Sequence, residues 1–546
     1  MRYALALAII VSLSFGLIQE SFRYQSTAGL WEDDYDLLFD PARIYEINGS
    51  RLWTSLSNFV TGDENQFSNG SVPYILLGAS KNFGNYYPGL VYDRSNQKDP
   101  LDTGLDDVNG NPIYGDGELS IIDWNDIDNN GEYDQRTLET EQRSAYDLYK
   151  DNNYYIGLGT KRGTLRFGLG YLHESYTNTF TNPLNNFTYS YVEENIPTDT
   201  TFINQADFAG DSIYGGSENG LLLSIWLDQQ KMSWGLAVGY NMLSGTDKAL
   251  ILGDSAIYTD PTDLTTFYTA ANVLDSMNIP ESGNQIAVEL KNFYNYSQNV
   301  QGRFYLGFYM ESGSISDDAS AYYHKTHDEI YTDFTWNTLT TTSYHDGANS
   351  SMGFRLGTKQ LFKVSERLKF GIGFFFGSYN STDSVAVRNT SVELTAYDDN
   401  DGNVFDPDDD STWVWSSETW MTKTTQSNHV LTFPVGLEFY LAQPLVFRLG
   451  AIHQISKGDY TTVINLIQYQ PERTLTKDNT GTIVEDLIDP GPEPVGSEET
   501  GKTNAPQTDY YYGVGWQVND NLQIDLMSFA QLTNLANWRL SATLKF

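Results

Sequence analysis

The stretch LRFGLGY, residues 165–171, decides the fold, because its large apolar side chains occupy every second position. One arginine and two glycines stand between them. A period of two is the pattern of a strand with unlike faces, and so many glycines do not suit a helix. The same pattern recurs in WGLAVGY at 234–240, RFYLGFYM at 303–310, LKFGIGF at 368–374, LTFPVGLEF at 431–439, YGVGW at 512–516 and WRLSATLKF at 538–546. These stretches predict an all-β fold, a transmembrane antiparallel up-and-down β-barrel with one face on lipid and the other on the lumen.

The last of these stretches ends in an aromatic residue, Phe546, with apolar residues at every second place before it. It resembles the C-terminal signature of bacterial outer-membrane barrels, and the resemblance implies that the barrel-assembly machinery is a partner. The alternative is an ordinary amphipathic strand that happens to end the chain.

The other end of the chain predicts export. MRYALALAIIVSLSFG has one basic residue, an apolar core from Ala4 to Leu13 and a small-x-small pattern at residues 14–16, which together predict a signal peptide. The core is shorter than the roughly 20 apolar residues of a membrane anchor. We therefore expect a signal peptide over residues 1–20, cleaved between Gly16 and Ser26, then an N-terminal periplasmic or plug segment over residues 21–50 and the barrel over residues 51–546.

Composition agrees with a barrel and excludes several other classes of protein. Aromatic residues make up 14% of a chain whose mean hydropathy is only -0.42, as expected where one strand face and the loops stay wet. Because there is no cysteine, disulfides and thiol chemistry are excluded. A net charge of -39 repels nucleic acid. The expected partners are outer-membrane lipid, lipopolysaccharide and a small-molecule solute, and the expected location is the bacterial cell outer membrane.

The connections between the strand-like stretches alternate between short and long. Short turns are predicted at 161–164, 228–231, 299–302, 364–367, 442–444 and 518–521, and long polar loops at 96–151, 176–216, 246–284, 315–348, 382–425 and 457–506. Short turns are typically periplasmic and long loops extracellular. With both termini in the periplasm the strand number is even, and we predict about 16 strands, with 14 or 18 if the segments near 52–60 or 87–94 are misassigned.

Applying the alternation to each strand predicts a lumen that is net basic toward the short-turn ends. The basic lumen residues are Arg166, Arg303, Arg355, Lys369, Arg448 and Arg539, with Lys161, Lys359 and Lys545 beside them. They form either an anion-attracting constriction or a wet wall whose cations pair with local acids. The lumen positions also hold many glycines, among them Gly159, Gly168, Gly371 and Gly513, which make room for a plug or a solute, or else permit tight curvature.

Two aspartate-rich loops resemble calcium loops. In the first, oxygen ligands and a glycine follow the usual spacing, but Thr137 stands where the bidentate glutamate belongs. Its candidate ligands are Asp126, Asp128, Asn130, Glu132 and Asp134, and those of the second loop are Asp399, Asp401 and Asp406. The alternative is a solvated acidic loop.

No cofactor is required by anything in the sequence, with Ca²⁺ in the extracellular loops as the one candidate ion. The pair His324 and His327 lies in a predicted loop without a third fixed ligand. Since there is no nucleophile elbow, phosphate-binding loop or zinc-protease motif, we do not expect an enzyme.

A short segment before the first strand carries a second resemblance. LWEDDYDLLFDPARI, residues 30–44, has an acidic pair, Asp33 and Asp34, followed by Asp40, Pro41 and Ala42. It resembles the start of the long-chain fatty-acid outer-membrane transporter family, in which an Asn-Pro-Ala motif follows a short helix tucked into the barrel, with Asp40 in place of the Asn. The resemblance implies an internal plug and passage of a hydrophobic or amphipathic compound. The alternative is a lead-in that closes the periplasmic mouth, with Asp40 and Pro41 starting a turn.

These observations predict an outer-membrane channel or transporter, a partly plugged porin-like barrel that passes a small solute. One alternative is a non-conducting barrel that anchors acidic loops, which bind calcium or surface partners. Another is a barrel subunit of a secretion machine.

Overall fold

The computed structural model describes most of the chain. The described residues are 20–56, 72–107, 109–127, 129, 131–195, 200–259, 268–316, 322–330, 335–397, 410–442, 444–477, 480, 482–487, 493–529 and 538–546. The predicted signal peptide lies almost entirely outside them, as do Asp128, Asn130, Asp399, Asp401 and Asp406. Among the described residues no helix is long and apolar enough to cross a membrane.

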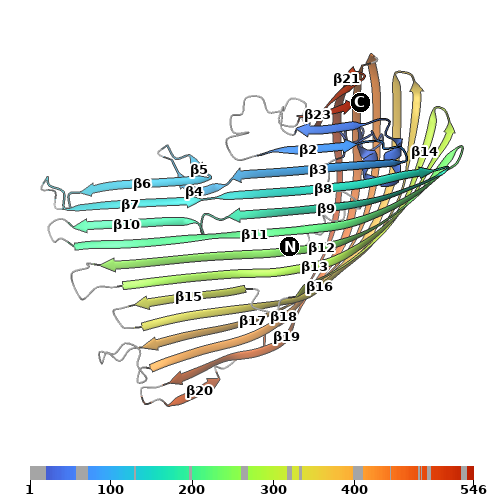
Figure 1. Cartoon of the computed structure of the whole chain (residues 1–546). Coiled ribbons are helices and arrows are strands. Elements are labelled where there is room, and N and C mark those ends of the chain that lie inside the picture. Colours follow the sequence, from blue (N-terminus) through green and yellow to red (C-terminus); the bar gives the residue numbers. More distant parts are fainter. Residues whose placement is uncertain are drawn as a thin grey trace.

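Sixteen antiparallel strands close into a barrel (Figure 1), which confirms the predicted fold class and strand number. Each strand pairs with the next, and β1 pairs with β23 from Arg51 beside Lys545 to Leu56 beside Leu540. In chain order they are β1 (Arg51–Leu56), β2 (Val72–Ser80), β3 (Tyr86–Pro100), β8 (Tyr146–Arg162), β9 (Leu165–Thr181), β11 (Thr200–Asp228), β12 (Met232–Thr259), β13 (Tyr268–Ser297), β14 (Val300–Ser316), β16 (Thr335–Ser365), β17 (Leu368–Tyr397), β18 (Asp410–Ala442), β19 (Leu445–Lys477), β21 (Ser497–Asn519), β22 (Leu522–Phe529) and β23 (Trp538–Lys545).

The chain end takes part in this closure. The backbone N–H of Ser50 donates to the carbonyl oxygen of Phe546 at 2.9 Å, and the N–H of Phe546 donates back to Ser50 at 3.2 Å. Because every strand of the barrel then has two neighbours, no unpaired sheet edge faces lipid.

The outer surface of the barrel is apolar, as the alternation predicted. On most strands, side chains at alternate positions are exposed apolar or aromatic residues, as in Leu165, Phe167 and Leu169 on β9 and Phe304, Leu306, Phe308 and Met310 on β14. In water such a continuous exposed apolar band would be unfavourable, whereas against lipid tails it is the expected surface of a membrane barrel.

The six predicted short turns are confirmed. Each joins two consecutive barrel strands through two or three residues, for example Gly163 and Thr164 between β8 and β9. Gly163 has a φ of 63°, a left-handed conformation that favours glycine. A further short connection, the five residues 81–85 between β2 and β3, contains Phe83, which forms a bridge with Tyr86 at the start of β3.

The prediction of long loops is wrong, because most of the described residues in those ranges form strands. Barrel strands continue far beyond the band: β16 has 31 residues, roughly 100 Å at about 3.3 Å per residue, where a membrane needs only about 9–11. Five further strands join them: β6 (Asp116–Asn125), β7 (Gln135–Ser144), β10 (Phe187–Asn195), β15 (Tyr322–Ile330) and β20 (Ile483–Leu487). We call the resulting layer the outer sheet; its strand order is β6, β7, β10, β11, β12, β13, β15, β16, β17, β18, β19 and β20.

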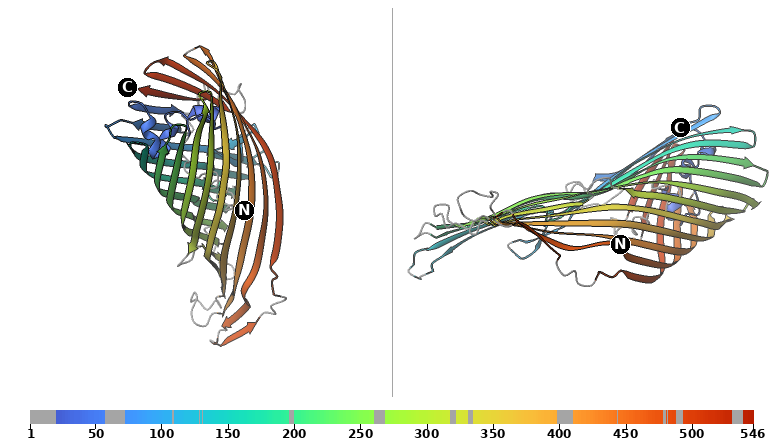
Figure 2. Two further views of the ribbon diagram at one scale, coloured as in Figure 1. Left: turned by 90° about the vertical axis from the view of Figure 1, so that its right-hand side faces the viewer. Right: turned by 90° about the horizontal axis from the view of Figure 1, so that it is seen from below.

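Figures 1 and 2 show that the outer sheet leaves the barrel on one side only. The opposite wall, formed by β1, β2, β22 and β23, has strands of only 6 to 9 residues. A small hairpin of β4 (Asp102–Asp106) and β5 (Pro112–Tyr114) lies beside β6. The sequence prediction failed here because both faces of the outer sheet carry many polar side chains, so the two-residue alternation of apolar and polar residues is lost.

Before β1, the segment from Glu20 to Ile47 folds into three short helical turns inside the barrel. These are α2 (Phe22–Ser26), η1 (Asp36–Phe39) and η2 (Pro41–Glu46), where η denotes a 3-10 helix. The Ser21 hydroxyl caps α2 by accepting the N–H of Tyr24 at 3.1 Å. We call this segment, residues 20–47, the plug.

Candidate functional site: the plugged lumen

The plug is bound to the lumen wall through its Asp-Pro-Ala step. Asp40 accepts hydrogen bonds from the Ser224 hydroxyl at 2.7 Å and from the Trp226 indole at 2.9 Å, both on β11. The N–H of Ala42 donates to the same Ser224 oxygen at 2.9 Å. Asp40 precedes η2, but its side chain makes no capping bond to that helix. Asp40 therefore ties the plug to the wall rather than only starting a turn.

A carboxylate of the wall, Glu438 on β18, is fully buried and holds the other end of the plug. Arg23 of α2 donates to both of its oxygens, at 2.7 and 2.9 Å. Lys369 and Arg448 of the neighbouring strands donate to it as well, at 3.0 and 3.3 Å. Arg448 also pairs with Asp525 of β22. One buried acid thus contacts one plug cation and two wall cations, and a second acid, Asp525, shares the charge of Arg448.

The acids of the plug pair in turn with cations of the wall. Glu32 accepts from Arg303 of β14 at 2.9 Å and from Arg43 of the plug at 3.0 Å. Burial raises the pKa of the Glu32 carboxyl, but the charges of Arg43 and Arg303 outweigh burial and hold the pKa well below its usual range. The carboxylate is therefore ionised and fixed.

The remaining plug residues predicted from the sequence have separate roles. Asp34 accepts from Arg51 of β1 at 2.8 Å. Asp33 accepts from the backbone of Tyr35 at 2.8 Å within the plug. The Pro41 ring lies against Gly168.

The predicted basic lumen residues do not form an open ring of charge. Arg166 pairs with Asp228 and with Glu46 of the plug, and the partners of Arg303, Lys369 and Arg448 are given above. Arg355 points into the lumen but stacks on Phe375 instead, with its guanidinium carbon 4.5 Å from the ring centre. Arg539 lies on β23, and its side chain is not among those the structure describes. The basic residues around the plug thus agree with the alternative in which lumen cations pair with local acids.

Lumen glycines form the seat of the plug, an outcome that the sequence left open. A Cβ at Gly159 or Gly168 would collide with the backbone of Pro41 and Ala42, and one at Gly450 would lie 2.6 Å from the N of Ala28. A Cβ at Gly513 would lie 2.6 Å from the Ser26 side chain. Because these collisions are mostly with backbone atoms, the glycines are needed for the plug and not only for curvature.

The outer half of the lumen is acidic, which the sequence analysis did not anticipate. Glu174 of β9 and Glu311 of β14 are buried there, and Glu218 of β11 is close enough to Glu311 for their charges to interact. Asn241, Gln285 and Glu311 form a hydrogen-bonded row across neighbouring strands. The sequence signal for these residues was their inward parity on strands next to the predicted long loops, at positions that the sequence analysis did not assign to the lumen.

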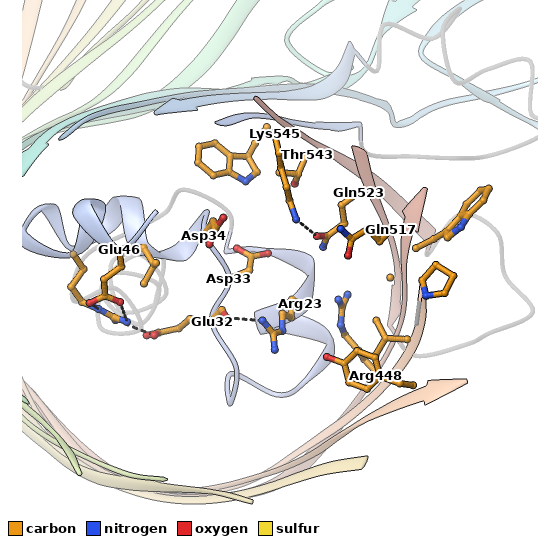
Figure 3. A pocket seen from close by; sticks show the side chains of 18 of the residues that line it. Arg23, Glu32, Asp33, Asp34, Glu46, Arg448, Gln517, Gln523, Thr543 and Lys545 are labelled. Carbon is orange, nitrogen blue, oxygen red and sulfur yellow. Dashed lines mark hydrogen bonds and ion pairs between the residues drawn. The ribbon is translucent and has the colours of Figure 1, made fainter. Parts of the chain in front are cut away.

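A cavity of about 410 Å³ lies between the plug and the wall (Figure 3). Its lining includes Arg23, Asp33 and Arg448 from the networks above and Trp516, Gln523 and Lys545 from the wall. Lys545 donates to Gln523 at 3.2 Å. Gln523 stands next to the short turn before β22, and the backbone N–H of Lys545 donates to Asn521 of that turn at 2.8 Å, so the cavity lies toward the periplasm.

The predicted calcium loops gain no support from the described residues. In the turn between β6 and β7, Asp126 accepts from the N–H of Gly131 at 2.8 Å and Asp134 from that of Ile127 at 2.9 Å. Among the residues that the structure describes, no three His, Asp or Glu side chains gather as metal ligands. Calcium binding stays a prediction.

Comparisons with known proteins give only distant structural matches. No family model matches the chain, and no curated protein does. Solved structures that match include the ferric yersiniabactin uptake receptor FyuA from Yersinia pestis, at 8% identity and a TM-score of 0.31, covering 91% of this chain and 80% of that one. The toluene transporter TbuX from Ralstonia pickettii matches at 10% identity and 0.29, covering 75% and 99%. The monoaromatic hydrocarbon channel CymD matches at 10% and 0.27, covering 98% and 99%.

TM-scores this low assign neither a family nor a solute, so the assignment rests on the chain's own structure. It has a closed barrel with an even strand number, an apolar outer band and short turns at one end. The protein is an outer-membrane β-barrel that carries its own N-terminal segment inside the lumen.

Proposed function

We propose that this protein is an outer-membrane channel for a small solute, closed by its own plug. The observation that carries the proposal is the seating of residues 20–47 on a wall of lumen glycines, held there by ion pairs and hydrogen bonds. Such contacts are reversible, since each can be exchanged for water when the segment moves.

The lining of the lumen supports passage of an amphipathic rather than a strongly hydrated solute. Apolar plug residues, among them Leu38 and Ile44, pack on Tyr155 and Val91 of the wall. Beside this apolar contact lies the polar cavity described above. A route opened by a shift of the plug would therefore have one apolar and one charged side.

Conductance in planar bilayers tests the proposal. We expect little conductance from the full chain and discrete steps from a chain lacking residues 20–48. Arg23→Gln should give intermediate opening, because it removes the plug's bidentate contact with Glu438. Arg388→Gln is the matched control, since Arg388 is an exposed arginine of the outer sheet, far from the plug along β17. Absence of conductance in all four proteins would overturn the channel.

A second candidate function, a non-conducting surface anchor, is favoured by the outer sheet. Strands that continue roughly 20 residues beyond the membrane are not needed for a pore. On this proposal the outer sheet binds a surface partner while the barrel only holds it in the membrane. The same bilayer experiment separates the two, because an anchor conducts neither with its plug nor without it.

A further inference from the structure

A row of lumen positions across β14, β16 and β17 differs from the rest of the wall. Arg355 of β16 stands between two glycines, Gly307 of β14 and Gly377 of β17, which are its register partners on either side. Lys359, which donates to the carbonyl oxygen of Gly29 in the plug, lies four residues nearer the periplasm on β16. The row is therefore roughly 13 Å outward of that plug contact along the strand.

The two glycines beside Arg355 leave the backbone of the lumen wall uncovered by side chains. A Cβ at Gly307 would meet nothing closer than the Cβ of Arg355 at 3.9 Å, and one at Gly377 would meet only the carbonyl oxygen of Phe354 at 3.9 Å. This contrasts with the glycines under the plug, where a Cβ would collide with backbone. Among the residues that the structure describes, no other atom lies within that distance of the space over Gly307 and Gly377.

Aromatic rings bound the row above and below. On the periplasmic side of Arg355, the Phe375 ring covers Gly357; on the extracellular side, the Tyr309 ring covers Gly353. The Tyr309 hydroxyl is buried, and among the described residues it has no hydrogen-bond partner. The row is thus open wall between two rings, which we call the recess, with one hydroxyl at its edge that has no partner among the described residues.

The guanidinium of Arg355 is available in this recess. Its side chain is exposed to the lumen, and no hydrogen bond or ion pair joins it to any residue that the structure describes. The other lumen arginines described above, Arg166, Arg303 and Arg448, each pair with a carboxylate. Glu20 at the start of the plug is close enough for the two charges to interact, but it is not bonded to Arg355.

We propose that the recess of Gly307, Arg355 and Gly377 binds a small aromatic carboxylate. The carboxylate takes the fork of the guanidinium in two parallel hydrogen bonds, since this is the geometry in which arginine binds such groups. The ring lies on the bare backbone of one glycine, between the Tyr309 and Phe375 rings, where aromatic contacts stabilise it. The Tyr309 hydroxyl donates to a polar substituent of the ring or to the carboxylate.

The site adds a class of solute to the proposed channel function, and its biological role rests on that function. A solute held here lies in the lumen just outside the plug, at the last position before the closed segment. Two aromatic rings beside one charged group are a usual lining of a small-molecule site. On the other side of Gly307 its second register partner, Glu289, is an acid that pairs with Lys291.

Calorimetric titration of the purified full chain in detergent tests the site, with benzoate as the probe. Benzyl alcohol supplies the ring without the charge, and acetate supplies the charge without the ring. We expect benzoate to bind more tightly than either. Arg355→Gln should weaken benzoate binding by about ten-fold or more, as expected for a lost charged hydrogen-bond pair, and Arg355→Lys should restore part of the loss.

Two further variants separate the parts of the site. Arg388→Gln is a matched control, because Arg388 is also exposed and stacks on a ring, Tyr344, at 4.4 Å, but in the outer sheet. It should leave benzoate binding unchanged. Gly307→Val fills the bare wall while keeping the charge, so it should weaken benzoate and leave acetate unaffected. Gly377→Ala gives a milder form of the same test.

Benzoate binding that survives Arg355→Gln, or acetate that binds as tightly as benzoate, would overturn the site. Titration does not depend on flux, so failure of the site and failure of the channel are distinguishable. Conductance of the plug-deleted chain without benzoate binding rejects only the site. Benzoate binding without conductance in any form rejects only the channel.

Discussion

At the scale of single residues, the two lumen glycines Gly168 and Gly307 have opposite surroundings. A Cβ at Gly168 would collide with the backbone of Pro41 and Ala42, whereas one at Gly307 has open space. Both residues face the lumen within regular antiparallel strands, so neither is required for a turn. The difference between them is only the presence of the plug.

The matched pair Gly168→Ala and Gly307→Ala tests this difference. We expect Gly168→Ala to displace the plug and raise conductance, because the added methyl group meets backbone that cannot rotate away. Gly307→Ala should behave like the unaltered chain. Heat-dependent gel mobility of both variants shows whether the barrel is intact. Equal conductance of the two variants would contradict a plug seated on glycine.

Glu32 determines how the plug responds to pH. A carboxyl whose pKa is depressed in the folded state contributes stability above its ordinary pKa of about 4.3, and loses it only as the pH falls toward the folded value. Because Arg43 and Arg303 hold the pKa of Glu32 that low, we expect its anchoring of the plug to persist from about pH 8 to about pH 5. Glu32→Gln should raise conductance throughout this interval. A chain that opens between these two pH values, with Glu32→Gln no different from it, would contradict the assignment.

At the scale of elements, the outer sheet shows how strands form without an apolar face. Residues 335–350 of β16 read TWNTLTTTSYHDGANS, which is rich in threonine, a residue that favours strands. Each of these residues has a register partner on β17, so the backbone is paired even where both faces are polar. Strand propensity and continuous pairing, rather than burial, extend the barrel strands here.

Hydrogen exchange distinguishes this sheet from loops. We expect the amides of residues 339–350 to exchange slowly, because β16 is paired with β17 throughout this range and, on its other side, with β15 at 339–343 and with β14 at 346–350. The turn residues 163–164 and 366–367 provide fast-exchanging references in the same protein. Exchange of residues 339–350 at the rate of the turns would show that the long connections are loops after all.

At the scale of the whole molecule, the apolar band determines where the barrel sits. Phe308 on β14 is 44% exposed and points outward eight residues from the nearest short turn, so it faces the middle of the membrane. Val392 on β17 is 38% exposed but lies in the outer sheet. Phe308→Arg should lower the free energy of unfolding in bilayers by about 2–4 kcal/mol, the range for a cation at the midplane.

Val392→Arg is the control and should change the unfolding free energy by less than about 0.5 kcal/mol, as for ordinary surface positions. Denaturant unfolding from lipid vesicles, followed by tryptophan fluorescence, measures both variants. A cost at Val392 as large as that at Phe308 would mean that the membrane does not lie where the apolar band places it.

Much of the fold was predictable from particular stretches. The alternation in residues 165–171 and 303–310 identified lipid-facing strands, and the short turns 228–231 and 518–521 located one end of the barrel. The inward side of Arg166, Arg303 and Arg448 followed from the same alternation. What Arg166 and Arg303 bind did not follow, because their partners Glu46 and Glu32 lie 120 and 271 residues away along the chain.

The sequence by itself determined the barrel. Each strand must meet lipid on one face and the lumen on the other, so apolar and polar or small residues alternate along each strand, and this alternation can be recognised in a short stretch of sequence. Only the tertiary structure decided what the lumen holds: a plug tied by Asp40 to β11, glycines that receive it, and Arg355, which stacks on Phe375 and has no ion pair with any described residue. The physical reason is that most lumen side chains find their hydrogen-bond and ion-pair partners on other segments of the chain. The polarity and spacing of residues along one strand do not indicate which segment lies opposite them.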